Sequence, residues 1–263
     1  MTALSTTPRP RLPFGTEEVQ FIKRSIIFTL RTPEVMVMAI ALPVMLMLLF
    51  TFVFGGAIDS GGDYVNYVVP GIILLCAGFG ASSIAVDVAK DLHTGIIERF
   101  RTMRIRSWAV LTGHVVSSLV RNLVATAVVI GVALAVGFRP VGSPTEWLAA
   151  IGVIALWILS ITYLYAAIGL AAGSEGAASG YGFALLFLPY ISSAFVPVST
   201  LPSWLQWVAQ HQPVTPIVET IRGLLMHTPL GNEPLYAVIW CAVILLIAVA
   251  WGTIMFRRKA GRR

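Results

Sequence analysis

Residues able to carry out chemistry are few in this sequence, and none of them falls into a catalytic pattern. Its three lysines, Lys23, Lys90 and Lys259, are followed by Arg, Asp and Ala, so none completes the Gly-x-x-x-x-Gly-Lys-Ser/Thr loop that holds nucleotide phosphates. The four histidines are scattered, and there is no His-Glu-x-x-His motif, nucleophile elbow or cysteine pair. Cys76 and Cys241 each lie within an apolar run, where cysteine packs as a small hydrophobe. We therefore expect no catalytic residue, no metal site and no cofactor bound by this chain.

The most heavily charged stretch, Asp87 to Arg106, has the pattern of an amphipathic helix. An apolar stripe recurs every three or four positions within it, at Leu92, Ile96, Phe100 and Met103. Charged residues surround the stripe: Lys90, Asp91, Glu98, Arg99, Arg101, Arg104 and Arg106. Thr94 is a suitable cap, and Gly95 would weaken a helix running straight on from the preceding apolar run. We predict a short helix over residues 90–106 that lies along the cytoplasmic face of a membrane and is exposed to another protein. The alternative is a solvated loop.

The composition requires a membrane to position such a helix. The chain has 263 residues, of which 57% are hydrophobic and only 11% charged, and its mean hydropathy is +0.84. A water-soluble domain needs more charge to cover its surface, so the sequence predicts an all-α integral membrane protein. The net charge of +6 does not indicate nucleic-acid binding, because the basic residues lie in blocks beside apolar spans.

Six stretches are long and apolar enough to cross a bilayer. We predict transmembrane helices at Val35–Phe54, Tyr64–Val86, Trp108–Phe138, Trp147–Ala172, Ala177–Val196 and Leu235–Phe256. Before them, residues 14–31 resemble an amphipathic helix that lies in the membrane interface. The predicted organisation is a tail and interfacial helix (1–34), one transmembrane domain (35–257) and a basic tail (258–263). Arg121 interrupts the third span: either the membrane part starts late, or Arg121 reaches inward along the bundle.

The positions of Lys and Arg indicate the orientation. Residues 1–34, residues 90–106 and the C-terminal tail each hold five of the 18, whereas the loops expected on the other side hold almost none. Positive residues concentrate on the cytoplasmic side of membrane proteins. Both termini and residues 90–106 are therefore predicted to be cytoplasmic. The plasma (inner) membrane of a bacterium is the location that the family resemblance described below implies.

Residues 197–233, on the predicted outer side, are too apolar for an ordinary loop. Pro202 with Trp204 and Trp207 predicts one short helix, and Thr215-Pro216 predicts the cap and first residue of a second. We expect a re-entrant hairpin that dips into the outer leaflet. Glu219 and Arg222 are spaced i, i+3, as either a helix-surface ion pair or a polar lock near an outer gate. Trp204 and Trp207 suit interfacial anchoring better than stacking on a transported molecule.

Several motifs, in this order, resemble the permease subunits of type 2 ABC exporters. Tyr67-Val68-Val69-Pro70-Gly71 opens the second span, and Gly95-Ile96-Ile97-Glu98-Arg99-Phe100 resembles the family's Gly-Thr-x-Glu-x-Leu coupling segment. Leu201-Pro202-Ser203-Trp204-Leu205 and Gln212-Pro213-Val214-Thr215, followed by Glu219 and Arg222-Gly223, resemble the outer hairpin of the daunorubicin-resistance branch. The chain departs from the pattern at Ile96, where Thr is usual, and at residues 103–106, where Pro is common.

The resemblance implies a homodimer, or a heterodimer with a sister permease, docked on two separate ATPase subunits that bind ATP and Mg²⁺. It also implies that the 90–106 helix transmits ATPase closure to the spans, through Leu92, Gly95, Ile96, Glu98, Arg99, Phe100 and Met103. Arg99 and its basic neighbours would pair with acidic groove residues or with lipid phosphates. Trp204, Trp207, Glu219 and Arg222 would belong to the outer gate or the substrate path.

The expected function is ATP-driven export of a hydrophobic or amphipathic molecule, such as a drug, a lipid or a secondary metabolite. Export of a polysaccharide or glycolipid by the same family is the nearest alternative. A secondary carrier would need an inverted repeat and a carboxylate at mid-depth, and the sequence shows neither clearly. A membrane enzyme lacks any catalytic constellation.

Overall fold

A computed structural model describes residues 33–58, 64–94 and 107–260 of the chain. Every regular element in these ranges is helical, as predicted. The elements are α2 (Pro33–Leu48), the π-helix η1 (Leu49–Phe54), α3 (Gly55–Ile58), α4 (Tyr64–His93), α6 (Ser107–Val136), α7 (Pro144–Ala171), α8 (Glu175–Leu185), the 3₁₀ helices η2 (Leu188–Ile191) and η3 (Val198–Thr200), α9 (Ser203–His211), α10 (Val214–Met226) and α11 (Glu233–Ala260). The predicted interfacial helix at residues 14–31 lies outside the described residues.

Four helices are long and apolar enough to cross a membrane, at Tyr64–Leu92, Val115–Val136, Pro144–Ala171 and Glu233–Met255. They coincide with the second, third, fourth and sixth predicted spans. The first predicted span is helical throughout, as α2 followed by η1, and its last six residues, Leu49–Phe54, are π-helical. No residue pattern had predicted this change of helix type.

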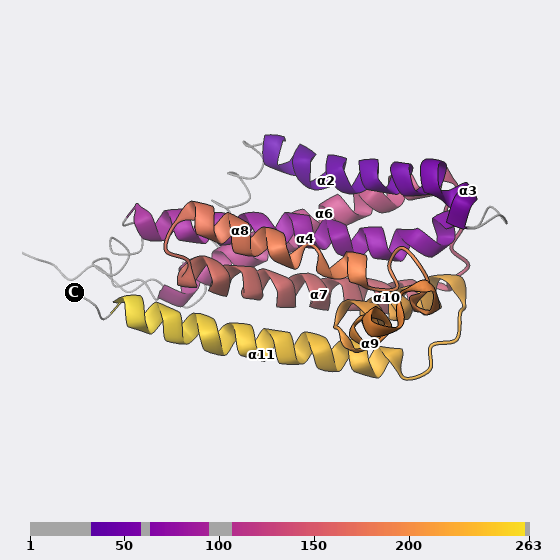
Figure 1. Cartoon of the computed structure of the whole chain (residues 1–263). Coiled ribbons are helices and arrows are strands. Elements are labelled where there is room, and N and C mark those ends of the chain that lie inside the picture. The colour runs from indigo at the N-terminus through magenta and orange to yellow at the C-terminus, as the bar shows by residue number, and fades with distance from the viewer. Residues whose placement is uncertain (1–32, 59–63, 95–106, 261–263) are drawn as a thin grey trace, which may run out of the picture.

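The helices run lengthwise and alternate in direction, with α4 inside the bundle and α11 on its outside (Figure 1). The most apolar window of α4 is 72% buried, against 17% for that of α11. Ile72, Ile73 and Leu75 of α4 are fully buried. At Gly169 of α7 an added Cβ would collide with the carbonyl oxygen of Ala85, so glycine allows α7 and α4 to touch through their backbones.

The start of α7 differs slightly from the prediction. The helix begins at Pro144 rather than Trp147, because Ser143 and Glu146 form a capping box and Pro144 occupies the first turn. The backbone N–H of Ser143 donates to Glu146 Oε2 at 2.6 Å. These residues were expected to be a turn and instead nucleate the helix.

The fifth predicted span is not one helix. α8 ends at Leu185, and a turn, η2 and an irregular stretch replace the helix expected to continue to Val196. Pro189 explains the break: it has no N–H to donate to the Leu185 carbonyl four residues earlier, and its ring would collide with that carbonyl. The prediction of a continuous helix over residues 177–196 is therefore wrong.

The second predicted span continues past Val86, because α4 runs to His93. Residues 90–93, assigned from the sequence to the cytoplasmic helix, thus form the last turn of α4. Leu92 packs against a small cluster that includes Ile84 and Leu170. The hydroxyl of Thr94 donates to the Lys90 carbonyl at 3.0 Å and closes the end of α4. Residues 95–106, with most of the predicted cytoplasmic helix, lie outside the described residues.

The predicted hairpin exists as two short helices, α9 and α10, at the end of the bundle opposite the C-terminal end of α11 (Figure 1). Its second helix starts two residues earlier than expected, at Val214 rather than Pro216, with Pro213 in the cap position and no side-chain cap. Thr215 is therefore not the cap. Its hydroxyl donates to the Ala209 carbonyl at 2.5 Å and ties α10 back to α9.

Candidate functional site

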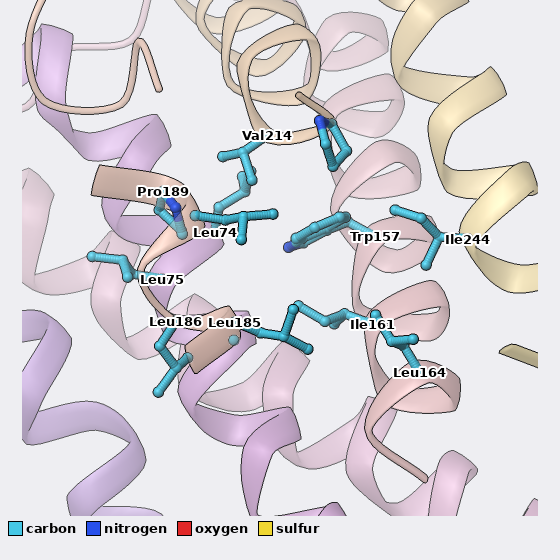
Figure 2. A pocket seen from close by; sticks show the side chains of 13 residues that line it. Leu74, Leu75, Trp157, Ile161, Leu164, Leu185, Leu186, Pro189, Val214 and Ile244 are labelled. Atoms are coloured by element: carbon cyan, nitrogen blue, oxygen red, sulfur yellow. The ribbon is translucent and has the colours of Figure 1, made fainter. Parts of the chain in front are cut away.

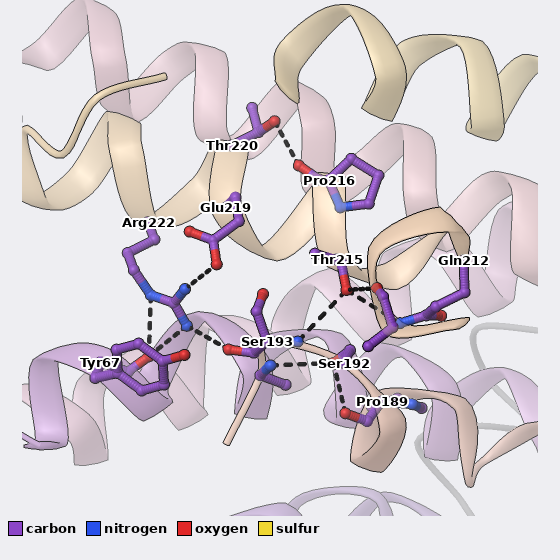
Figure 3. A network of polar contacts seen from close by, with 12 residues as sticks. Tyr67, Pro189, Ser192, Ser193, Gln212, Thr215, Pro216, Glu219, Thr220 and Arg222 are labelled. Carbon is purple, nitrogen blue, oxygen red and sulfur yellow. Dashed lines mark hydrogen bonds and ion pairs between the residues drawn. The ribbon is translucent and has the colours of Figure 1, made fainter. Parts of the chain in front are cut away.

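Arg222 is the centre of a buried polar network at the inner side of the hairpin (Figure 3). It lies in α10 next to Val218 and Ile221 on the face that packs on the bundle, and only 5% of the residue is exposed. Its Nη2 donates to the carbonyl of Tyr67 in α4 at 3.0 Å and to the carbonyl of Ser193 at 2.8 Å. Its Nε also donates to Tyr67, at 3.3 Å, and its Cζ lies 3.8 Å from the centroid of the Tyr67 ring. One side chain thus connects the hairpin, α4 and the irregular segment after α8.

Glu219 pairs with Arg222 as the spacing predicted, with Oε1 2.6 Å from Nη1. The pair is unequal, because the Arg222 side chain is 6% exposed and that of Glu219 32%. A helix-surface pair would leave both groups in contact with solvent. The pair is therefore not a fully exposed surface pair, and its action as a polar lock near an outer gate stays a prediction.

Side chains also hold the irregular stretch after η2, where the backbone lacks helical hydrogen bonds. The Ser192 hydroxyl donates to the Pro189 carbonyl at 2.5 Å, and the Tyr64 hydroxyl donates to the Phe195 carbonyl at 2.7 Å. At Gly71 of α4 an added Cβ would lie 2.6 Å from the Cβ of Ala194, so this segment rests directly on the α4 backbone. Non-helical backbone at membrane depth is tolerated where protein groups satisfy it in this way.

Trp204 and Trp207 do not join the Arg222 network. They are 73% and 66% exposed on α9, and Trp207 stacks on His211 with ring centroids 4.7 Å apart. This exposure suits the predicted interfacial anchoring, because amphipathic rings favour the headgroup level. Their assignment to a substrate path stays a prediction.

Arg121 reaches inward, which decides between the two possibilities left by the sequence. It is 9% exposed in α6, and its Nη2 donates to the Gly80 carbonyl at 2.9 Å and to the Ser83 hydroxyl at 2.7 Å, both in α4. A guanidinium within a span is costly unless polar groups of the bundle receive it. Its neighbour Asn122 packs against Gly80 so closely that an added Cβ would collide with its Oδ1. Arg121 therefore joins α6 to α4.

Sequence reasoning predicted Glu219 but missed the other partners of Arg222, which are backbone carbonyls. Tyr67 was noted only as part of the motif that opens the second span, and Ser193 was not singled out. Six of the seven predicted coupling residues, Gly95, Ile96, Glu98, Arg99, Phe100 and Met103, lie outside the described residues. Within the described ranges, no three His, Cys, Asp or Glu side chains converge to hold a metal ion. Cys76 and Cys241 are buried and unpaired with each other, as expected of small packing residues.

The fold and composition define a multi-pass helical membrane protein. Residues 17–226 match the ABC-2 type transporter family, and the chain belongs to that family. It is 28% identical over 230 residues to the daunorubicin resistance ABC transporter permease protein DrrB1 of Streptomyces coeruleorubidus, covering 86% of this chain and 81% of that protein. It is 25% identical over 227 residues to the probable doxorubicin resistance ABC transporter permease protein DrrC of Mycobacterium tuberculosis, covering 84% and 81%. It is also 25% identical over 215 residues to the putative transport permease ycf38 of Cyanophora paradoxa, covering 79% and 73%.

Proposed function

We propose that this chain is the transmembrane permease subunit of an ATP-driven exporter that moves a hydrophobic or amphipathic molecule out of a bacterial cell. The observation that carries the proposal is the family match over residues 17–226, together with relatives named as drug-resistance permeases. The sequence has no phosphate-binding loop, so a separate ATPase subunit would bind and hydrolyse ATP with Mg²⁺. Two permease chains, identical or sister, would assemble with two such subunits.

The arrangement of the helix ends supports coupling through residues 95–106. The end of α4 and the start of α6, which this segment joins, lie at the same end of the bundle as the C-terminal end of α11 (Figure 1). The hairpin lies at the opposite end. Lys90 and the basic residues after Met255 thus share one end, which agrees with a cytoplasmic placement of that end. We propose that an ATPase binds there and that α4 and α6 receive its movement.

Arg222 and Glu219 are proposed to hold the outer gate closed. Arg222 binds carbonyl oxygens on two other segments, so the hairpin cannot leave the bundle without breaking these bonds. Charged hydrogen bonds in a low-dielectric site are strong, so breaking them opposes movement of the hairpin. Release of Arg222 from Tyr67 and Ser193 would free the hairpin and the irregular segment after α8 together.

The described helices offer little support for an ion-driven carrier. The carboxylates of the four long helices are Asp87 and Asp91 toward the end of α4, Glu146 in the first turn of α7 and Glu233 at the start of α11. A proton-coupled mechanism ordinarily uses an acid near the middle of a span. Export of a polysaccharide or glycolipid remains the alternative within the family.

The proposal is tested by transport in inside-out vesicles that contain the chain and the ATPase encoded beside it. ATP should drive uptake of a fluorescent amphipathic drug such as daunorubicin, and the two proteins should copurify. Phe100→Asp should abolish uptake. The matched control Phe100→Leu introduces the leucine that is usual at this position of the family's coupling segment, and it should retain uptake. No copurifying ATPase, or uptake driven by an ion gradient without ATP, would refute the proposal.

A further inference from the structure

A small apolar cavity lies inside the bundle, below the hairpin (Figure 2). Its volume is about 50 Å³, and its walls come from α4, α7, α8, η2, α10 and α11. The lining side chains are aliphatic, proline or glycine except for one, Trp157 of α7. Leu74, Ile161, Pro189, Val214 and Ile244 represent the separate elements that surround it.

Trp157 turns a hydrogen-bond donor into this cavity. The residue is 4% exposed, and its indole Nε1 has no hydrogen-bond partner. Figure 2 shows the nitrogen on the edge of the ring that faces Leu74, across the open space. A buried N–H without an acceptor is unfavourable, and nearly all such groups in folded proteins find one. The indole therefore calls for an acceptor inside the cavity.

Water is a poor candidate for that acceptor. A buried water ordinarily makes about three hydrogen bonds and needs at least two polar partners. Among the side chains that line the cavity, only that of Trp157 carries a polar atom. An apolar molecule with one acceptor oxygen matches the walls and the single donor together.

The depth of the cavity argues against a lipid ester as the source of that oxygen. Trp157 lies at the middle of the 28 residues of α7, about 20 Å from either end at 1.5 Å per residue. The ester groups of lipids border a hydrocarbon core about 30 Å thick, so they lie about 15 Å from the bilayer centre. An acceptor at this depth must belong to a molecule that enters the apolar core.

We propose that the cavity binds an uncharged apolar molecule through one carbonyl or ether oxygen that accepts from Trp157 Nε1. The space corresponds to about four water-sized spheres, so it takes a small molecule or the acceptor-bearing end of a larger one. That the bound molecule is transported cargo rests on the function proposed above. The binding site itself does not.

The walls also connect the site to the candidate gate. Pro189 and Val214 line the cavity, while the Pro189 carbonyl accepts from Ser192 and Val214 precedes Thr215 in α10. Ser193, held by Arg222, also bonds to Thr215 through its backbone N–H at 3.4 Å. An occupant would therefore press on both segments that the polar network joins.

The test uses the full chain in nanodiscs, with the tryptophan indoles labelled with ¹⁵N. The chain has seven tryptophans, and Trp157→Phe assigns the signal of Trp157. Titration with cyclobutanone should move the Trp157 proton signal downfield and saturate. Methylenecyclobutane, which has the same shape without the oxygen, should not produce the shift.

Two substitutions check the location. Val214→Ile adds a methylene to the cavity wall and should weaken cyclobutanone binding about tenfold or more, whereas Val238→Ile on the exposed face of α11 should leave it unchanged. Trp157→Phe keeps the aromatic wall and should weaken binding about fivefold to tenfold, measured by ligand NMR.

Four results would overturn the proposal. The Trp157 signal could ignore cyclobutanone, respond equally to both compounds, or shift together with all other indoles as a bulk solvent effect. A Trp157 signal that differs between diester and diether lipid nanodiscs without ketone would assign the oxygen to lipid and also overturn it. Because no ATPase is present in the nanodiscs, the binding test can fail while ATP-driven transport succeeds. Binding can equally be observed where ATP-driven transport fails.

Discussion

Replacing Arg222 by methionine measures how firmly the hairpin is held. The substitution keeps much of the aliphatic volume but removes the donors to the carbonyls of Tyr67 and Ser193 and the cation over the Tyr67 ring. Hydrogen bonds inside helical membrane proteins contribute about 0.6 to 1.7 kcal/mol each, and a desolvated cation–π contact about 1 to 2 kcal/mol. Together these predict a loss of about 3 kcal/mol in the free energy of unfolding.

Glu219→Gln is the matched comparison, because it removes only the ion pair. Glu219 is about one third exposed, so water screens the pair and its loss should cost less than about 1 kcal/mol. Arg222→Lys should fall between the two, because an ammonium cannot reproduce the planar fork that reaches both carbonyls. The difference in the free energy of unfolding between Arg222→Met and Glu219→Gln therefore measures how much the contacts of Arg222 other than the ion pair stabilise the fold.

Equilibrium unfolding in mixed micelles of dodecylmaltoside and SDS, followed by circular dichroism, gives these free energies. If Arg222→Met costs no more than Glu219→Gln, the carbonyl bonds do not hold the hairpin and the lock proposed here is wrong. If Arg222→Lys equals wild type, the geometry of the guanidinium is irrelevant, which contradicts the reasoning in the same way.

Three further outcomes follow from other contacts. Gly71→Ala should destabilise the fold by about 1 to 3 kcal/mol in the same unfolding assay, because the new methyl collides with Ala194 in the irregular segment after α8. Gly131→Ala, in open space on α6, should be neutral or stabilising by up to about 1 kcal/mol. Equal effects of the two substitutions would contradict the close approach at Gly71. Tyr64→Phe should cost about 1 kcal/mol through the lost bond to the Phe195 carbonyl, and an unchanged unfolding midpoint would count against that bond. Glu98→Lys should abolish ATP-dependent uptake while membrane insertion, measured by yield in the membrane fraction, stays normal; normal uptake would remove the coupling role from this residue.

The long helices were predictable because their signal is local. An uncharged run of more than 20 residues has few alternatives to a helix in a membrane, since every backbone group must be satisfied within the segment. The bounds of α6 and α11 accordingly agree with the sequence to within a few residues. The start of α7 was also readable, because Ser143 and Glu146 have capping-box spacing, but Pro144 was interpreted as part of a turn.

The network around Arg222 was not predictable in the same way. Its bond to Tyr67 joins positions 155 residues apart, and its acceptors are backbone carbonyls, which every residue carries. No residue type marks such an acceptor in the sequence. The i, i+3 spacing predicted the pair with Glu219, which is the more exposed of the contacts that Arg222 makes. The sequence thus identified the right side chain and only its most local partner.

In the irregular segment after α8, a single residue, Pro189, determines whether the backbone is a rigid helix or an adjustable segment. Pro189 ends α8 at Leu185, so the backbone from there to α9 is held by side chains that include Tyr64, Ser192 and Arg222. A helix resists bending because its hydrogen bonds are cooperative, whereas side-chain bonds to single carbonyls can be exchanged one at a time. Among the described segments of the bundle, we therefore expect a change of shape to be least costly here, between the Arg222 network and the Trp157 cavity. Pro189 thus prevents a simple transmembrane helix and also places the adjustable segment between the Arg222 network and the cavity.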